Sequence, residues 1–175
     1  VASGEAPGIE ARGSVLDKLA LLPGVRQLDD RIGTVAVPPQ FTLTAVWDGT
    51  RLRAEGFRPA ELGKAAFVER LRAELPGGVE VADATRAGSG SPEAFVDLAA
   101  FAVRQLASLS SGTATLTGRT LSLKGEAPDP ESYNAVRAAL RALPGGAATG
   151  TIEIEPPLLR PFLWSAERQG DGSVV

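Results

Sequence analysis

The 175-residue chain contains no cysteine, no histidine and no methionine. Without cysteine it has no disulfide framework, no thiol nucleophile and no zinc–thiolate site. Without histidine it lacks the commonest general base and the commonest protein metal ligand. No stretch approaches the roughly 20 apolar residues that a helix needs to cross a bilayer. These absences exclude most routes to nucleophilic or metal-dependent catalysis and predict a soluble segment.

The charge is also modest, at −3 with a pI of about 5.1. Nucleic-acid binding depends on a dense set of Lys and Arg side chains, so we predict no nucleic-acid partner. A serine nucleophile needs a neighbouring base, and neither a Ser-x-x-Lys nor a Gly-x-Ser-x-Gly motif is present. Carboxylates are scattered and form no calcium-loop pattern. The sequence therefore predicts a protein that is not an enzyme and binds neither a metal nor a cofactor.

What the chain does contain is a repeat. Gly4-Glu5-Ala6-Pro7 recurs 121 residues later at Gly125–Pro128, and Leu22-Pro23-Gly24 recurs at the same offset. A middle copy carries Gly56 and Leu75-Pro76-Gly77, and part of it matches the third copy at an offset of 69. We interpret the repeat glycines as structural, required by the backbone conformation or by close packing, rather than as ligand contacts. They are Gly4, Gly24, Gly49, Gly56, Gly77, Gly118, Gly125 and Gly145.

The middle copy shows the order of elements best. Apolar residues alternate along Phe41–Trp47, and the turn Asp48-Gly49 leads into Thr50–Phe57, which together predict a hairpin. A helical stripe follows within Ala60–Leu75, and a strand is predicted at Val79–Asp83.

The third copy reads the same way. It has a hairpin of Thr113–Thr117 and Thr120–Lys124, a helix whose N-terminus is marked by Asp129-Pro130-Glu131, and a strand at Thr151–Glu155. A further helix, expected to be capped by Ser91-Pro92-Glu93, precedes this copy after a loop at Ala87–Gly90. The first copy has only a helix and a strand at Ile32–Val37. The fold class is therefore α+β, with small mixed sheets of about three strands and amphipathic helices packed on one face.

An α-β-β-α-β order in about 60 residues, with a glycine closing the hairpin, resembles the BON domain. Gly56 and Gly125, with Gly4 as the equivalent in the first copy, and the Leu-Pro-Gly triplets carry this resemblance. The arrangement is similar to the tandem BON regions of bacterial OmpA-family envelope proteins. The resemblance implies a periplasmic, outer-membrane-associated location and a non-catalytic scaffold that assembles with envelope proteins or the cell wall. It implies, as an alternative, a phospholipid-binding module. A homo-oligomer is compatible with both.

The repeat predicts four segments: residues 1–37 as the C-terminal part of a truncated BON-like unit, 38–86 as a second unit, 87–157 as a third, and 158–175 as the start of a further unit or a tail. We therefore expect the segment to begin and end inside repeat units. The second unit departs from the pattern because its hairpin follows Pro38-Pro39 without a leading helix. This leaves open whether it shares a helix or a sheet edge with a neighbour.

Three side chains are candidates for surface contact. Arg51 and Arg53 share one strand face and would reach anionic headgroups, although Glu55 on the same face weakens this reading. Trp164 is a candidate interfacial anchor, whereas Trp47 lies in phase with the apolar alternation and is predicted to be in the core. The segment Gly88–Ser91 is interpreted as a capped loop before a helix rather than as a phosphate cradle, because no lysine follows it and it does not match a P-loop.

Overall fold

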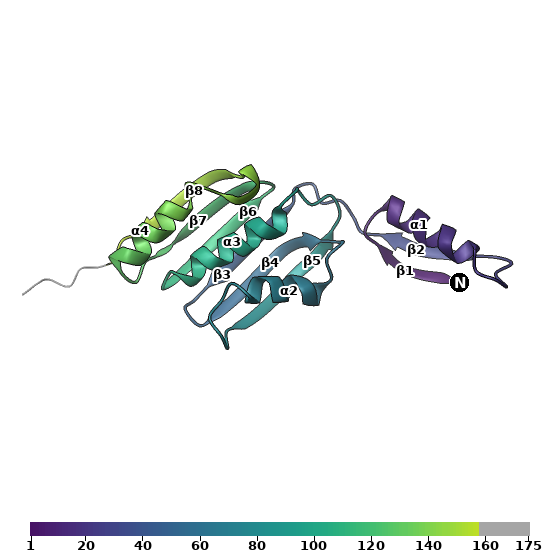
Figure 1. Cartoon of the computed structure of the whole chain (residues 1–175), viewed down its shortest axis with the longest axis horizontal. Helices are drawn as coiled ribbons and strands as arrows, with labels where there is room; N and C mark the ends of the chain where they lie inside the picture. The colour runs from purple at the N-terminus through teal and green to yellow at the C-terminus, as the bar shows by residue number, and fades with distance from the viewer. Residues whose placement is uncertain (158–175) are drawn as a thin grey trace, which may run out of the picture.

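The structure is a computed structural model, and it describes residues 1–157. It contains two parts, which lie end to end in Figure 1. The N-terminal unit (residues 1–37) is a small β-α-β element. The sheet domain (residues 41–155) is one mixed six-stranded sheet with three helices in front of it.

The strand order of the sheet domain is β5-β4-β3-β6-β7-β8. Neighbouring strands are antiparallel at the centre, while both outer pairs, β4–β5 and β7–β8, are parallel. The strands are β3 (Thr42–Trp47), β4 (Arg51–Pro59), β5 (Glu80–Gly88), β6 (Ser111–Thr117), β7 (Thr120–Glu126) and β8 (Ala148–Glu155). The order is symmetric about the β3–β6 pair, so two β-β-α-β units meet edge to edge.

The β3–β4 hairpin forms where its sequence predicts it. The Asp48 carboxylate accepts hydrogen bonds from the backbone N–H groups of Thr50 and Arg51, at 2.9 and 2.8 Å. Gly49 adopts a φ of 92°, which the turn requires and which other residues rarely adopt. Period-2 alternation then places Leu43, Ala45 and Trp47 on the helix-covered face, where all three are buried.

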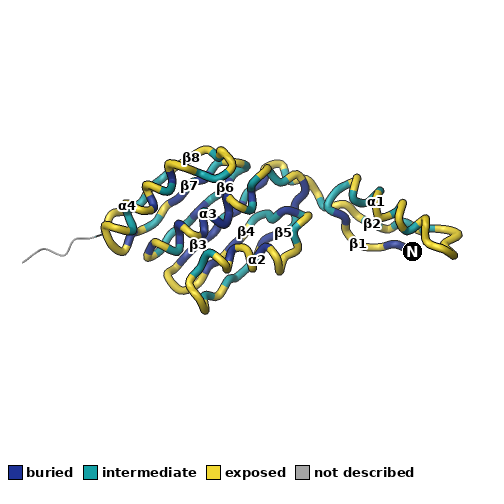
Figure 2. Tube along the Cα trace, in the orientation of Figure 1, coloured by how far each residue is buried: buried dark blue, intermediate teal, exposed yellow. Residues whose placement is uncertain are grey.

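Three helices cover that face: α2 (Lys64–Arg72), α3 (Phe95–Ala107) and α4 (Pro130–Ala139). A short 3₁₀ turn, η1 (Pro144–Gly146), follows α4. α3 contacts both central strands and lies between α2 and α4 (Figure 1). Its apolar stripe is almost fully buried, as Figure 2 shows, and packs in one core with residues from both units.

The α+β class predicted from the sequence is confirmed. The small sheets of about three strands are joined into one, so the second unit shares a sheet edge with its neighbour, one of the alternatives that the sequence left open. Antiparallel pairing of β3 with β6 joins the two sheets into one. This pairing also explains why the second unit has no leading helix. α3 covers β3 as well as β6, so a single helix serves both units.

Several element boundaries also differ from those predicted. α3 begins at Phe95 after Ala94, and no side chain caps it, so the predicted cap at Ser91 is wrong. β5 continues to Gly88, into the segment predicted as a loop. At the end of α2 the positive φ belongs to Gly78 rather than Gly77. The predicted cap of α4 is confirmed: the Asp129 carboxylate accepts a 2.7 Å hydrogen bond from the Ser132 N–H.

The N-terminal unit contains β1 (Ala2–Ala6), α1 (Ile9–Ala20) and β2 (Asp30–Thr34), with β1 and β2 paired in parallel. Arg12 of α1 forms an ion pair with Asp30, and the hydrogen bond from this guanidinium lowers the pKa of the Asp30 carboxyl. No residue of α1 is buried. The unit thus repeats the β7-α4-β8 part of the third unit but has far less of a core, as the exposed tube in Figure 2 shows.

Candidate functional site

The helices cover only one face of the six-stranded sheet. The side chains of the opposite face, which we call the open face, are partly or fully exposed because no described element packs on them. Many of them are hydroxyl-bearing: Thr42, Thr44, Thr113, Thr115, Thr117, Thr120 and Ser122. They occupy the two central strands and β7, so the middle of the open face is uncharged and rich in hydroxyl groups.

The strand register aligns these side chains in rows across the sheet. Thr44 lies opposite Thr115, which in turn lies opposite Ser122. A second row runs from Thr42 through Thr117 to Thr120. Neighbouring strands are about 4.8 Å apart, so each row presents hydroxyls at a regular spacing. The Ser122 hydroxyl also accepts a 3.1 Å hydrogen bond from the Thr151 N–H, which ties the row to β8.

Ion pairs border the hydroxyl rows on both sides. On the β4–β5 side, Arg51 contacts Glu80 at 2.7 Å. Arg53 contacts Glu55 at 3.2 Å on the same strand. On the β7–β8 side, Lys124 contacts Glu153 at 2.7 Å. Each of these basic side chains therefore already has a carboxylate partner.

A hollow of about 290 Å³ lies on the β6–β8 part of this face. Its walls carry the Lys124–Glu153 pair and two further carboxylates, Glu126 and Glu155. Beneath it Gly112 and Gly125 lie opposite each other, and a Cβ on Gly125 would come within 2.5 Å of the Ser111 carbonyl oxygen. The hollow is acidic overall, so it favours a neutral or cationic group over an anion.

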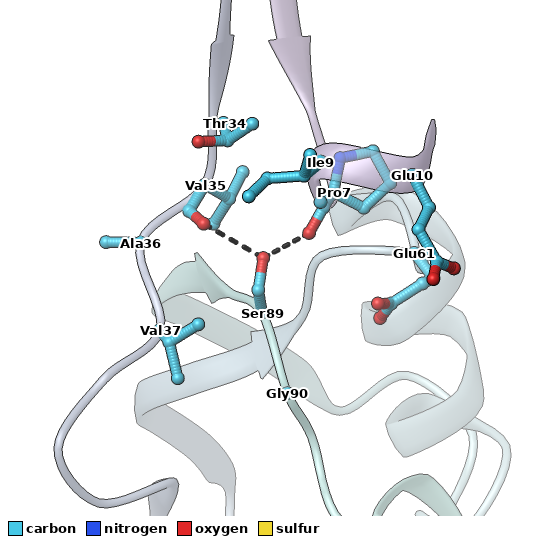
Figure 3. A pocket seen from close by; sticks show the side chains of 11 residues that line it. Pro7, Ile9, Glu10, Thr34, Val35, Ala36, Val37, Glu61, Ser89 and Gly90 are labelled. Carbon is cyan, nitrogen blue, oxygen red and sulfur yellow. Dashed lines mark hydrogen bonds between the residues drawn. The ribbon is translucent and has the colours of Figure 1, made fainter. Parts of the chain in front are cut away.

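A second hollow, of about 500 Å³, lies where the N-terminal unit meets the sheet domain (Figure 3). The Ser89 hydroxyl points between the two parts and contacts the carbonyl oxygens of Pro7 and Val35. The backbone N–H of Ser89 bonds to the Ala36 carbonyl at 3.1 Å. Ser89 thus uses its hydroxyl and its N–H to hold the N-terminal unit, while the predicted cap on the following helix is not formed.

The structure places the predicted surface residues in different settings. Arg51 and Arg53 both lie on the open face, as expected for residues two apart on a strand. Both form ion pairs with carboxylates. Trp164 lies outside the described residues. Trp47 is in the core, as predicted: it is 4% exposed, and its indole N–H donates a 2.9 Å hydrogen bond to the Leu109 carbonyl.

Most of the repeat glycines occupy turns or tightly packed strand positions, whereas a Cβ on Gly4 of β1 would meet open space. Gly49 and Gly118 are in the hairpin turns, and Gly24 and Gly145 follow helices, all with positive φ. The hydroxyl rows were not predicted from the sequence. The alternating polar residues of Thr42–Trp47 and Ser111–Thr117 were visible in the sequence. The pairing of β3 with β6, which brings these polar residues together on one face, could not be predicted from that alternation.

The described residues bring together no three carboxylates able to hold a metal ion. Within the same part of the chain no helix is both long enough and apolar enough to cross a membrane. No protein-family model matches the sequence, and no curated protein matches it either.

Proposed function

We propose that this chain is a non-catalytic scaffold module of the bacterial cell envelope, which contacts the cell wall or a wall-associated partner through its open face. The repeat architecture, with its resemblance to tandem BON regions, supports a periplasmic location near the outer membrane. The absence of histidine and cysteine from the sequence supports a binding role over a catalytic one.

The observation that carries the proposal is the pair of hydroxyl rows on an uncovered sheet face. Threonine hydroxyls both donate and accept hydrogen bonds, and their methyl groups add apolar contact. Rows with a regular spacing suit an extended polymer that carries hydroxyl and amide groups. Peptidoglycan has this chemistry, and the rows of the open face offer it several contacts at once.

A phospholipid surface is the alternative, and the charges of the open face make it weaker. Arg51 and Arg53 are already paired with carboxylates, and Lys124 is paired as well. Even two free arginines would contribute only about 2 kcal/mol at an anionic surface. The acidic hollow beside Glu126 and Glu155 further repels anionic headgroups.

Co-sedimentation with isolated peptidoglycan sacculi tests the proposal. We expect the wild-type chain to sediment with the sacculi, and Thr44→Val combined with Thr115→Val to reduce the bound fraction several-fold. These changes remove two facing hydroxyls while keeping the shape and strand propensity of the side chains. Thr34→Val, on the exposed β2 strand of the N-terminal unit, is the matched control and should bind like the wild type.

Vesicles of anionic lipid, sedimented in parallel at low salt, separate the two functions. Binding to vesicles but not to sacculi would replace the proposal with the phospholipid alternative. Binding to neither, or binding to sacculi that the double variant retains in full, would overturn the role of the open face.

A further inference from the structure

The two outer strands of the six-stranded sheet, β5 and β8, hold the same place in their units. β5 pairs in parallel with β4 as β8 pairs in parallel with β7. Asp83 and Thr85 of β5 correspond to Ile152 and Ile154 of β8, because both these residues and their strand partners are 69 positions apart. The two edges can therefore be compared residue by residue.

The outer edge of β5 is occupied by side chains of its own unit. The Thr85 N–H donates a 2.9 Å hydrogen bond to the Asp83 carboxylate. The Asp83 carbonyl accepts a 3.2 Å hydrogen bond from the Lys64 ammonium group, and the Thr85 carbonyl accepts one of 3.4 Å from the Arg58 guanidinium group. An edge whose donors and acceptors are already bonded is a poor template for another strand.

The outer edge of β8 lacks this protection. The Glu155 carbonyl accepts a 3.0 Å hydrogen bond from the Ala127 N–H, so it points toward β7. Backbone groups of successive residues point to alternate sides of a strand, so those of Ile152 and Ile154 point to the outer edge. An isoleucine side chain cannot bond to them, and within residues 1–157 no other side chain does. This edge therefore offers free donors and acceptors.

A hollow of about 290 Å³ lies beside this edge, between β8 and α4. It is lined by Tyr133 and Arg137 of α4 and by Ile152 and Ile154 of β8. β8 is the outermost strand, and α4 lies in front of this end of the sheet (Figure 1). The tyrosine and the two isoleucines pack against the core and give the hollow apolar walls. In the second unit the position of Tyr133 is held by Lys64, which bonds to β5 instead.

The charge beside the hollow is positive. The Arg137 guanidinium lies 5.3 Å from the centre of the Tyr133 ring, and it donates a 3.1 Å hydrogen bond to the Tyr133 hydroxyl. Within residues 1–157 it forms no ion pair. Side chains of a strand alternate between faces, so Glu153 and Glu155 of β8 point to the open face. A strand added to β8 would thus meet a cation on the helix-covered face and carboxylates on the open face.

We propose that the outer edge of β8 binds an extended peptide segment of a partner protein. The segment pairs antiparallel with β8, the orientation that gives the more stable ladder. Its side chains toward α4 are apolar, with one carboxylate that reaches Arg137, and its side chains toward the open face are hydroxyl-bearing or basic. Main-chain hydrogen bonds give the affinity, and the hollow selects the side chains. This site is separate from the hydroxyl rows proposed to contact the cell wall.

Fluorescence anisotropy with a labelled synthetic peptide tests the proposal. The probe is a short, end-blocked peptide in which valines and one central glutamate alternate with threonines and lysines. We expect it to bind the full chain. Methyl groups on the valine and glutamate nitrogens should abolish binding, because these N–H groups face β8 in the antiparallel pairing, whereas methyl groups on the other nitrogens should be tolerated. No binding of the first peptide, or equal binding of both methylated forms, would overturn strand addition.

Variants of the chain test the hollow. Arg137→Gln should weaken binding of the glutamate peptide several-fold and leave binding of a matching glutamine peptide unchanged. Arg86→Gln, at an arginine that also lies over an aromatic ring, is the matched control and should bind like the wild type. Tyr133→Lys, Ile152→Asp and Ile154→Thr together copy the residues that occupy the edge of β5, and should reduce binding about tenfold or more.

Two outcomes would contradict the choice of partner. A preference for the glutamate peptide that survives Arg137→Gln would overturn the assignment of the acidic group. Analytical ultracentrifugation of the chain alone covers a second copy as the occupant. Self-association of the wild type that the triple variant abolishes would assign the edge of β8 to a second copy and overturn the proposal.

Discussion

Ala45 of β3 and Ala114 of β6 lie directly opposite each other at the centre of the six-stranded sheet, and they hold the same position in two repeat units 69 residues apart. The pairs on either side are related by the same offset: Leu43 lies opposite Leu116, and Trp47 lies opposite Gly112, the residue that corresponds to Leu43. The sheet domain is thus a pseudo-twofold dimer of units within one chain. α3 breaks the symmetry because one helix covers both halves.

Bulky side chains at this pair should separate the helix layer from the sheet. Ala45 and Ala114 are 3% and 2% exposed on the helix-covered face. We expect Ala45→Leu and Ala114→Leu each to lower the free energy of unfolding by roughly 1–3 kcal/mol, because the packed core has no room for three more carbons. The double variant should depart from additivity by about 0.5 kcal/mol or more, since the two side chains are in contact.

Urea denaturation measures these effects, and the neighbouring pair provides the control. Thr44 and Thr115 are also directly opposite, but on the open face. Thr44→Leu and Thr115→Leu should change the free energy of unfolding by no more than about 0.5 kcal/mol. Equal losses at the two pairs would contradict the assignment of the two faces.

Local patterns predicted the individual elements well because each depends on neighbours in sequence. The hairpin at Asp48-Gly49 and the cap at Asp129 need only a few adjacent residues. The repeat offset then predicted that the second and third units share a topology. The β3–β6 pairing is different, because residues 65 to 75 apart in sequence form it and α3 packs over both units.

The same limit applies to the candidate site. The alternation of side chains along a strand predicted that Arg51 and Arg53 share one face. It did not predict that Glu80 would be the carboxylate partner of Arg51. Glu80 belongs to β5, which pairs with β4 only through a parallel crossover. The predicted cap at Ser91 is not formed, and the neighbouring Ser89 hydroxyl bonds to Pro7, 82 residues away in sequence, a contact that no local pattern could reveal.

Trp47 should be sensitive to the loss of its single polar group. We expect Trp47→Phe to lower the free energy of unfolding by roughly 1–3 kcal/mol in thermal or urea denaturation. The variant leaves the buried carbonyl of Leu109 without its 2.9 Å hydrogen bond and also leaves a small cavity. An unchanged denaturation midpoint would mean that a water molecule donates the hydrogen bond to the Leu109 carbonyl in place of the indole N–H.

Two repeat glycines should respond differently to the same change. A Cβ on Gly125 would lie 2.5 Å from the Ser111 carbonyl oxygen and 2.8 Å from a Leu109 methyl, so Gly125→Ala should cost roughly 1–3 kcal/mol of stability. A Cβ on Gly77 would meet no described atom within 4 Å beyond its chain neighbours, and the φ of Gly77 is not positive, so Gly77→Ala should be neutral or slightly stabilising. Chemical denaturation of the two variants side by side checks this contrast.

The pairing of Glu74 with two arginines should make stability depend on pH. The Glu74 carboxylate contacts Arg104 of α3 at 2.7 Å and Arg70 of α2 at 2.9 Å, so it links the two helices. The hydrogen bond from Arg104 is the main cause that lowers the pKa of Glu74 below its ordinary value of 4.5. A carboxyl with a lowered pKa in the folded state stabilises the fold fully above its unfolded pKa, and this contribution is lost as pH falls through the folded pKa.

Glu74→Gln should therefore lower the free energy of unfolding by about 1 kcal/mol at pH 7, because Arg104 is largely exposed and water weakens the pair. The difference between the variant and the wild type should shrink once the pH falls below about 4.5, as the wild-type carboxyl becomes protonated. Glu69→Gln is the control, because Glu69 is exposed and its partner Arg72 lies on the same helix. Denaturation curves from pH 3 to 7 that kept a constant difference for Glu74→Gln would show that its effect comes from packing rather than from charge.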